Sequence, residues 1–169
     1  GMLGMHGNLG PNINTNKCDV LIAVGMRFDD RVTGNLATYA KQAKVIHFDI
    51  DSAEVNKNVH ADIAVLGDCK ETLVAVTELL QANTHTEWLE SFTDYERMEE
   101  EKVIRPELDP MSDTLTMGEV VRAVSEATHN EAILVTDVGQ NQMMSARYFK
   151  YSKERSIITS GGLGTMWFG

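Results

Sequence analysis

The sequence predicts an α/β protein built from parallel-sheet, Rossmann-like units. Short β-branched runs alternate with helical patterns along the 169 residues, as in a parallel sheet with crossover helices. Glycines and charged residues follow directly after several of these runs. Hydrophobic residues make up 43% of the chain and charged residues 24%, which is typical of a folded domain and not of a disordered segment.

Three strands are predicted in the first half of the chain. Residues 19–24 form an apolar run typical of a fully buried strand, and Gly25 turns the chain at its end. We expect a helix over residues 35–42, a second strand over 44–50 and a third over 63–66. The alternation predicts that these strands pair in parallel.

A helix is predicted after the third strand. Asp68 can cap it, with Glu71 three residues later, and its spacing gives it one apolar face. We expect that face to be buried; it consists of Leu73, Val76, Leu79 and Leu80.

The composition changes between residues 84 and 113. Thr86 can cap a helix in which Trp88, Phe92 and Tyr95 recur at helical spacing, and we interpret this aromatic stripe as packing. The acidic run 99–101 is interpreted as a solvated helix face. We therefore expect residues 84–113 to connect two domains, with residues 1–83 in the first and residues 114–169 in the second.

The second domain opens with a strong helix signal. Thr116 and Glu119 form a capping box, and Leu115 can pack against Val120 across the first turn. Strands are expected over residues 132–136 and 156–159, with a short helix between them that ends near Arg147. The buried face of the first helix is predicted to consist of Val120, Val121, Val124 and Ala127.

Charge and composition exclude several functions. The net charge of −10 opposes nucleic-acid binding, which depends on clustered Lys and Arg. No apolar run approaches the roughly 20 residues that cross a bilayer, and no signal segment opens the chain, so we expect a cytoplasmic protein. Cys18 and Cys69 are predicted to be free thiols, and the scattered histidines do not indicate a metal site.

The strand ends predict a nucleotide site. Glycine allows a backbone to approach a diphosphate, Arg27 and Arg31 can pair with it, and a carboxylate such as Asp49 can accept from ribose hydroxyls. Two simpler readings stay open: the glycines can be plain turns, and the arginines can pair with neighbouring aspartates. The sequence lacks Gly-x-Gly-x-x-Gly and Walker patterns, so motifs favour neither hydride transfer nor ATP hydrolysis.

Five stretches of the chain together resemble one enzyme family. They are Gly4-Met5-His6-Gly7, Gly25-Met26-Arg27-Phe28-Asp29-Asp30-Arg31-Val32-Thr33-Gly34, His47-Phe48-Asp49-Ile50-Asp51, Asp137-Val138-Gly139-Gln140-Asn141-Gln142-Met143 and Ser160-Gly161-Gly162-Leu163-Gly164-Thr165-Met166. In this order and spacing they resemble acetolactate synthase, also called acetohydroxyacid synthase, over essentially the whole chain. The second and fifth stretches are specific to this enzyme among thiamine-diphosphate proteins.

The resemblance implies two cofactor sites on this chain. It implies that the chain carries the second half of a central FAD-binding domain and the start of a domain that holds the diphosphate of thiamine diphosphate. The implied FAD positions are Met5, His6, Gly7, Gly25, Met26, Arg27, Asp29, Arg31, Val32, Asp49, Ile50, Gly67 and Asp68. The implied thiamine-diphosphate positions are Val138, Gly139, Gln140, Asn141, Gly164 and Met166, and the implied substrate-channel positions are Asp30 and Arg31.

The implied reaction joins two 2-ketoacids, pyruvate with pyruvate or 2-ketobutyrate, with loss of carbon dioxide, in branched-chain amino acid biosynthesis. In the family, the catalytic glutamate lies upstream of the segment that this chain resembles, and the magnesium ligands lie downstream of it. We therefore expect an internal fragment with no catalytic residue and no metal ligand of its own, inactive alone, whose parent forms a homo-oligomer and can take a regulatory subunit.

Two residues depart from the family pattern. Asn141 stands where the family has a histidine between two glutamines, and Trp167 stands where it has a glycine. An indole in a close-packed loop is expected to clash.

Three other hypotheses fit the sequence. The chain can be an FAD-binding module without catalysis, a segment of another thiamine-diphosphate carboligase such as glyoxylate carboligase, or a truncated product that associates with itself through exposed apolar surface.

Overall fold

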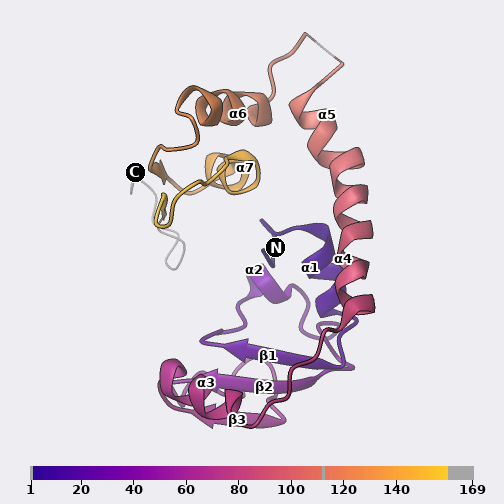
Figure 1. Ribbon diagram of the computed structural model, residues 1–169, viewed down its shortest axis with the longest axis vertical. Coiled ribbons are helices and arrows are strands. Elements are labelled where there is room, and N and C mark those ends of the chain that lie inside the picture. Colours follow the sequence, from indigo (N-terminus) through magenta and orange to yellow (C-terminus); the bar gives the residue numbers. More distant parts are fainter. Residues whose placement is uncertain (1, 112, 160–169) are drawn as a thin grey trace. The chain divides into compact units, whose positions relative to one another are not determined.

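The computed structural model describes residues 2–111 and 113–159 of the chain (Figure 1). The chain divides into two compact units, Gly1–Glu96 (unit 1) and Arg97–Gly169 (unit 2). The division falls inside the long helix α4, which spans Thr86–Glu99. Helices alternate with parallel strands, so the predicted α/β class is confirmed. None of the helices in the described ranges has both the length and the apolar character needed to cross a membrane.

Unit 1 is organised by a three-stranded parallel sheet. Its strands are β1 (Val20–Val24), β2 (Lys44–Asp49) and β3 (Ile63–Leu66), in the order β1-β2-β3, as the apolar runs predict. Val24 is paired with Phe48, and Asp49 with Leu66. Because all three strands run in the same direction, their carboxyl ends lie at one edge of the sheet.

The core of unit 1 lies on the central strand. Four of the six residues of β2 are buried, on both faces of the strand. One face packs into a cluster of buried residues that consists of Ala23, Phe28, Tyr39, Ala40, Val45 and Ala61. The exposed residues of β1 and β3 leave β2 as the best-covered strand.

The helix predicted over residues 35–42 is wrong, because this segment is a series of turns. Ala40 has φ of 44°, which an α-helix cannot contain, and its N–H donates to the Asn16 side chain over 2.8 Å. The Asn35 side chain accepts from the N–H of Ala37, which is the short-range competition that asparagine offers to helix formation.

Two short helices in unit 1 were not predicted. They are α1 (Leu9–Thr15) and α2 (Asp30–Thr33). The first contains Gly10 and Pro11, whose low helix propensity argues against a helix at this position. Pro11 lies in its first turn, where the missing N–H costs nothing. Figure 1 shows α1 alongside α4, and the Asn14 side chain donates to the Ser91 hydroxyl over 2.9 Å.

Helix α3 (Cys69–Thr77) begins as predicted but is not buried as predicted. The Asp68 side chain caps it by accepting from the N–H of Lys70 over 2.8 Å. None of its residues is buried, and Leu79 and Leu80 follow its end with 83% and 67% of their surface exposed. The predicted buried face is wrong, because Leu73, Leu79 and Leu80 are exposed and Val76 is only half-buried.

The segment from α4 to α5 is almost continuously helical. A π-helical stretch, η1 (Glu100–Ile104), joins α4 to α5 (Arg105–Leu108). The Trp88 and Phe92 rings meet edge-to-face with centroids 5.8 Å apart, so the aromatic stripe is packing as predicted. The acidic run is only partly solvated. Glu99 is buried and pairs with Arg147 over 3.2 Å, whereas Glu100 and Glu101 are exposed.

Unit 2 contains helices α6 (Met117–Ala127) and α7 (Gln140–Tyr148) and a parallel pair of strands, β4 (Leu134–Thr136) and β5 (Ile157–Thr159). The predicted capping box is confirmed: the Thr116 hydroxyl accepts from the N–H of Glu119 over 3.2 Å, and the Glu119 carboxylate accepts from the N–H of Thr116 over 2.9 Å. The predicted buried face is wrong, because Val120, Val124 and Ala127 are exposed and Val121 is half-buried. Leu115 is also exposed, so it does not form the predicted staple.

Candidate functional site

Three predicted site residues lie side by side at the carboxyl edge of the unit 1 sheet. Gly25 follows β1, Asp49 ends β2 and Gly67 follows β3. The N–H of Gly25 donates to the carbonyl of Phe48 over 2.8 Å, and the N–H of Gly67 donates to the carbonyl of Asp49 over 3.0 Å. The sheet therefore continues one residue past each outer strand and holds this row in register.

The glycines of this row suit the approach of a ligand backbone or phosphate. Gly25 has φ of 59°, and a methyl group built on it would meet no atom within 4 Å in the part of the chain that the structure describes. The space above it is therefore open, and its conformation is one that side chains rarely adopt. Gly67 has φ of 154° and leads directly into the capped start of α3 through Asp68.

The carboxylates of the edge are already partly engaged. Asp49 is buried, and its Oδ1 accepts from the N–H of Asp51 over 2.9 Å. Its Oδ2 lies 3.5 Å from Nε2 of the fully buried His47. Ile50, the next predicted contact, is 74% exposed and points away from the core. One carboxylate oxygen at the edge thus faces a histidine that the sequence did not single out.

The segment after β1, residues 26–31, forms a tight turn that we call the hook. Phe28 is buried with φ of 52°, and the Asn58 side chain donates to the carbonyls of both Arg27 and Phe28 over 3.1 Å. Asp29 caps α2 by accepting from the N–H of Arg31. Arg27 pairs with Asp29 over 3.4 Å, so the simpler reading, in which an arginine pairs with a neighbouring aspartate, holds for this residue.

The loop of Gly4 to Gly7 closes on this hook. The N–H of Met5 donates to the carbonyl of Arg31 over 2.9 Å, and the Asn12 side chain bonds both the N–H and the carbonyl of Gly4 over 2.9 and 3.0 Å. A methyl group on Gly4 would lie 2.8 Å from the Arg31 carbonyl oxygen, so only glycine allows the approach. Nδ1 of His6 is buried with no hydrogen-bond partner among the described residues.

A pocket of about 460 Å³ lies where the loop meets the hook. Its walls include four predicted site residues, Met5, Asp30, Arg31 and Val32. The buried hydroxyl of Tyr39, which also lines it, lacks a partner in the described chain, and burial raises the pKa of this phenol. Gly25, Asp49 and Gly67 do not line this pocket, so the predicted FAD positions form two groups, the strand-end row and the loop pocket.

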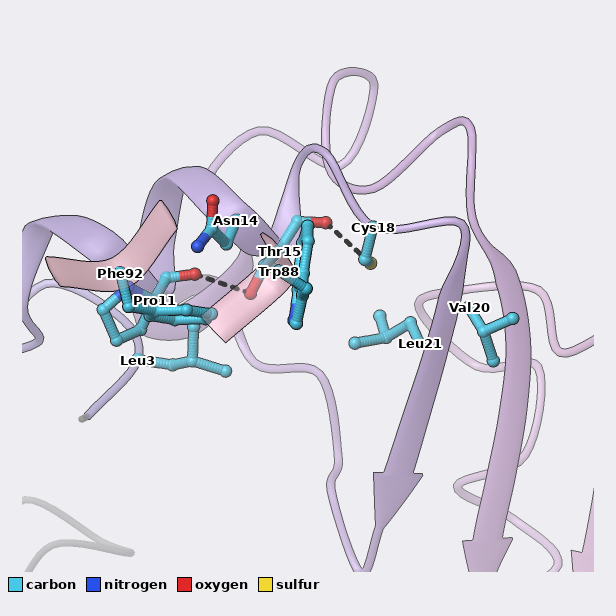
Figure 2. A pocket seen from close by; sticks show the side chains of 9 residues that line it. All are labelled: Leu3, Pro11, Asn14, Thr15, Cys18, Val20, Leu21, Trp88 and Phe92. Atoms are coloured by element: carbon cyan, nitrogen blue, oxygen red, sulfur yellow. Dashed lines mark hydrogen bonds between the residues drawn. The ribbon is translucent and has the colours of Figure 1, made fainter. Parts of the chain in front are cut away.

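A second pocket, of about 360 Å³, was not predicted (Figure 2). It is mostly apolar, and its lining side chains come from the N-terminal loop, α1, β1 and α4. The Thr15 hydroxyl donates to the Pro11 carbonyl over 2.8 Å, and the Cys18 thiol donates to the Thr15 carbonyl over 3.1 Å. Burial raises the pKa of the Cys18 thiol, which makes it a poor nucleophile. Cys18 is a free thiol, as predicted.

In unit 2 the predicted positions follow β4. Val138 and Gly139 lead into α7, which begins at Gln140 and Asn141. Gly139 has φ of 135°, and a methyl group built on it would meet no atom of the described residues within 4 Å. The neighbouring Gln142 donates to the Thr159 hydroxyl over 2.8 Å, which ties the start of α7 to β5. Gly164, Met166 and Trp167 lie outside the described residues.

The two strand-end sites share one chemical property. Each combines a glycine of positive φ, Gly67 or Gly139, with the N-terminus of a following helix of nine residues, whose N–H groups and dipole favour an anion. In unit 1 the exposed Arg31 adds positive charge. Across residues 2–111 and 113–159, no group of three His, Cys, Asp or Glu side chains is placed to hold a metal ion. Glycines before helix N-termini are the chemical features with which proteins bind phosphate groups.

Comparisons with known proteins place this geometry in context. A family model, the thiamine pyrophosphate enzyme central domain, matches residues 1–76. Over 171 residues the chain is 41% identical to the acetolactate synthase isozyme 3 large subunit of Escherichia coli, a match of 100% of the chain and 30% of that protein. It is 41% identical to the acetolactate synthase large subunit of Lactococcus lactis, over 100% of the chain and 29% of that protein. It is 40% identical to the chloroplastic acetolactate synthase 1 of Nicotiana tabacum, over 99% of the chain and 25% of that protein. The chain thus spans between a quarter and a third of the length of these relatives.

Proposed function

The chain belongs to the acetolactate synthase large-subunit family, and on that premise we propose that it is part of a thiamine-diphosphate enzyme that condenses two 2-ketoacids. The proposed substrates are pyruvate with pyruvate or 2-ketobutyrate, with loss of carbon dioxide, in branched-chain amino acid biosynthesis. Thiamine diphosphate supplies the carbanion chemistry when bound, and the protein orients the reacting groups. The two bacterial relatives are named large subunits, which supports a proposed regulatory subunit. Self-assembly of the parent is likewise proposed.

The strand-end row and the loop pocket of unit 1 are proposed to hold FAD. The observation that carries this assignment is the parallel register that aligns Gly25, Asp49 and Gly67 at one edge. The open space at Gly25 suits a diphosphate, the N-terminus of α3 adds N–H donors, and Asp49 is placed to accept from ribose hydroxyls. His6, whose buried Nδ1 lacks a partner in the described chain, is proposed to bond the ligand.

The start of α7 is proposed to hold the diphosphate end of thiamine diphosphate. Gly139 opens the backbone, and the N-terminus of α7 presents free N–H groups at Gln140 and Asn141. The Gln142 bond to Thr159 fixes the helix start against the strand pair. Magnesium, its ligands and the catalytic glutamate are proposed to belong to other parts of the enzyme.

The proposed domain division stays at residues 83 and 113, and the cytoplasmic location stays a prediction. A narrower function, FAD binding without catalysis, is favoured for the isolated chain by one observation. All proposed FAD positions lie within one compact unit of the chain, unit 1.

Calorimetric titration of FAD and of thiamine diphosphate into the 169-residue chain tests the site assignment. We expect FAD to bind and Arg31→Ala to weaken it by roughly tenfold, because a cation beside a diphosphate contributes a charge-assisted bond. Lys41→Ala removes an equal, exposed charge from the same unit and is the matched control. No FAD binding, or equal losses in both variants, would contradict the assignment.

The reaction is tested on the complete reading frame. Its product, supplied with both cofactors and magnesium, is expected to consume pyruvate with release of carbon dioxide and to form acetolactate. Faster turnover of glyoxylate than of pyruvate would instead identify another carboligase.

A further inference from the structure

His47 is the most deeply buried ionisable side chain of unit 1. It lies in the middle of β2, the central strand, and 0% of its surface is exposed. Neither of its ring nitrogens has a hydrogen-bond partner among the described residues. A buried polar group without a partner is destabilising, so a histidine at this position calls for a specific role.

The His47 ring lies among small and aromatic side chains, with the Asp49 carboxylate close to one of its nitrogens. Its partners across the sheet are Ala23 on β1 and Ala64 on β3, which are too small to reach over the ring. The Phe28 ring meets it edge-to-face with centroids 5.1 Å apart. Oδ2 of Asp49 lies 3.5 Å from its Nε2. The imidazole therefore points one nitrogen towards the carboxyl end of its own strand.

Asp49 is held at one oxygen and open at the other. Its Oδ1 accepts from the N–H of Asp51 over 2.9 Å, which fixes the plane of the carboxylate. Its Oδ2 lies 3.5 Å from Nε2 of the His47 ring. Because Asp49 ends the strand beside the one that leads into Gly25, it occupies the place where an acidic residue accepts from the ribose hydroxyls in dinucleotide-binding units.

We propose that His47 is a positioning residue for Asp49, and that the pair recognises the vicinal hydroxyls of a nucleotide ribose. The Nε2–H of a neutral imidazole donates to Asp49 Oδ2 and orients the remaining lone pairs towards the ligand. The contact, long in the free chain, shortens when the hydroxyls bind, as hydrogen bonds in unliganded sites commonly do. This inference rests on the proposed FAD site and adds the residue that sets its ribose-binding group.

The tautomer of His47 tests the pair without any ligand. Nitrogen-15 spectra of the histidine side chains in the full chain, with His47 identified by its loss in His47→Gln, are expected to show the proton on Nε2. Asp49→Asn is expected to shift that resonance, whereas Asp51→Asn is expected to leave it in place. A proton on Nδ1, or no response to Asp49→Asn, would overturn the inference.

FAD affinity tests what the pair does. His47→Phe keeps a ring and removes the donor, and we expect FAD binding to weaken by roughly tenfold, as for loss of one hydrogen bond to a charged group. His47→Gln restores an N–H donor of similar reach, so it is expected to recover most of that loss; His60→Gln, at an exposed histidine, is the matched control. A purely structural role would leave the glutamine variant as weak as the phenylalanine variant.

A double-mutant cycle separates this inference from the proposed function. In an Asp49→Asn background, His47→Phe is expected to cause no further loss of FAD affinity, because its effect acts through the carboxylate. If the losses of FAD affinity from the two substitutions were additive, the inference that His47 acts through Asp49 would be overturned. If the unsubstituted chain bound no FAD, the proposed cofactor site would fail, while the tautomer experiment would still decide whether His47 donates to Asp49.

Discussion

Strand β2 and helix α6 were both predicted from apolar patterns, yet they are held in place by different forces. Four of the six residues of β2 are buried, including Val45 and Phe48. In α6 the buried residues are Gly118 and Ser125, and its valines stay largely exposed. The same kind of pattern thus marks a covered strand in one unit and an uncovered helix in the other.

Polar contacts replace apolar burial around α6. The capping box holds its start, and the Arg122 guanidinium donates to the Leu108 carbonyl over 2.7 Å. Near its end, the Ser125 hydroxyl donates to the Asn130 side chain over 2.7 Å and accepts from the N–H of Lys150 over 3.1 Å. The apolar face of α6 shows which surface would gain from burial against another segment. The hydrogen bonds show what holds the helix within unit 2.

The largest expected effect tests the apolar side of this comparison. Phe48→Ala should lower the free energy of unfolding of unit 1 by about 3–5 kcal/mol, because it leaves a cavity beside the central strand. Val124→Ala, in an exposed position of α6, should change the stability of unit 2 by no more than about 0.5 kcal/mol. Native-state amide hydrogen exchange reports on both units in one experiment. Equal effects would mean that the exposed valines are covered in solution by another copy of the chain.

The strands of both units could be predicted because their signal is local. Each is a β-branched run bounded by glycine or a charged residue, and the strand predictions err by at most two residues at their ends. The helix over residues 35–42 could not be corrected from sequence, because a contact from Asn16 to the N–H of Ala40, distant along the chain, helps to fix its turns. The predicted burial of α3 and α6 was wrong for a related reason. The spacing of apolar residues shows which face of a helix is apolar but not which segment covers that face.

In the candidate site, too, some features could be predicted from the sequence and others could not. Gly25, Asp49 and Gly67 were predicted to lie together because parallel strands bring their carboxyl ends to one edge. The role of Asn12 was not predicted, because its two hydrogen bonds to Gly4 depend on the unpredicted helix α1. His47 was noticed only as a strand residue. The spacing of two residues to Asp49 places both side chains on one face of β2, and that is the signal that could have paired them.

The middle-sized effect tests the polar side of the comparison. Thr116→Ala removes the cap of α6, and we expect it to destabilise unit 2 by about 1 kcal/mol. The same hydroxyl donates to the carbonyl of Glu107 over 2.5 Å, so the loss should also loosen α5. Thr114→Ala, an exposed threonine two residues earlier, is the control and should have little effect. Hydrogen exchange in α6 that rises equally in both variants would argue against the cap as its anchor.

The smallest effect tests whether a polar contact matters for the buried sheet. At the amino end of β2, Asp62 accepts from the N–H of Val45 over 2.8 Å, and this bond, followed by the one from Lys44, holds the pKa of the carboxyl below its ordinary value. Unfolding raises that pKa, so the unfolded chain binds the extra proton first. The stabilisation is complete above the ordinary aspartate range and is lost as the pH falls through the lower folded value. Asp62 is solvated, so we expect a smaller loss from Asp62→Asn at neutral pH than from Thr116→Ala, and this difference from the unsubstituted chain should vanish in acid.

Urea unfolding from about pH 6 down to about pH 3, followed by circular dichroism, measures this difference. Asparagine still accepts from the Val45 N–H, so the variant isolates the charge from the hydrogen bond. Glu126→Gln, at an exposed carboxylate of α6, serves as the control. A gap that widens as the pH falls would mean that Asp62 is strained in its charged form. The sheet edge would then depend on burial alone, and the contrast between β2 and α6 would be sharper than the hydrogen bonds suggest.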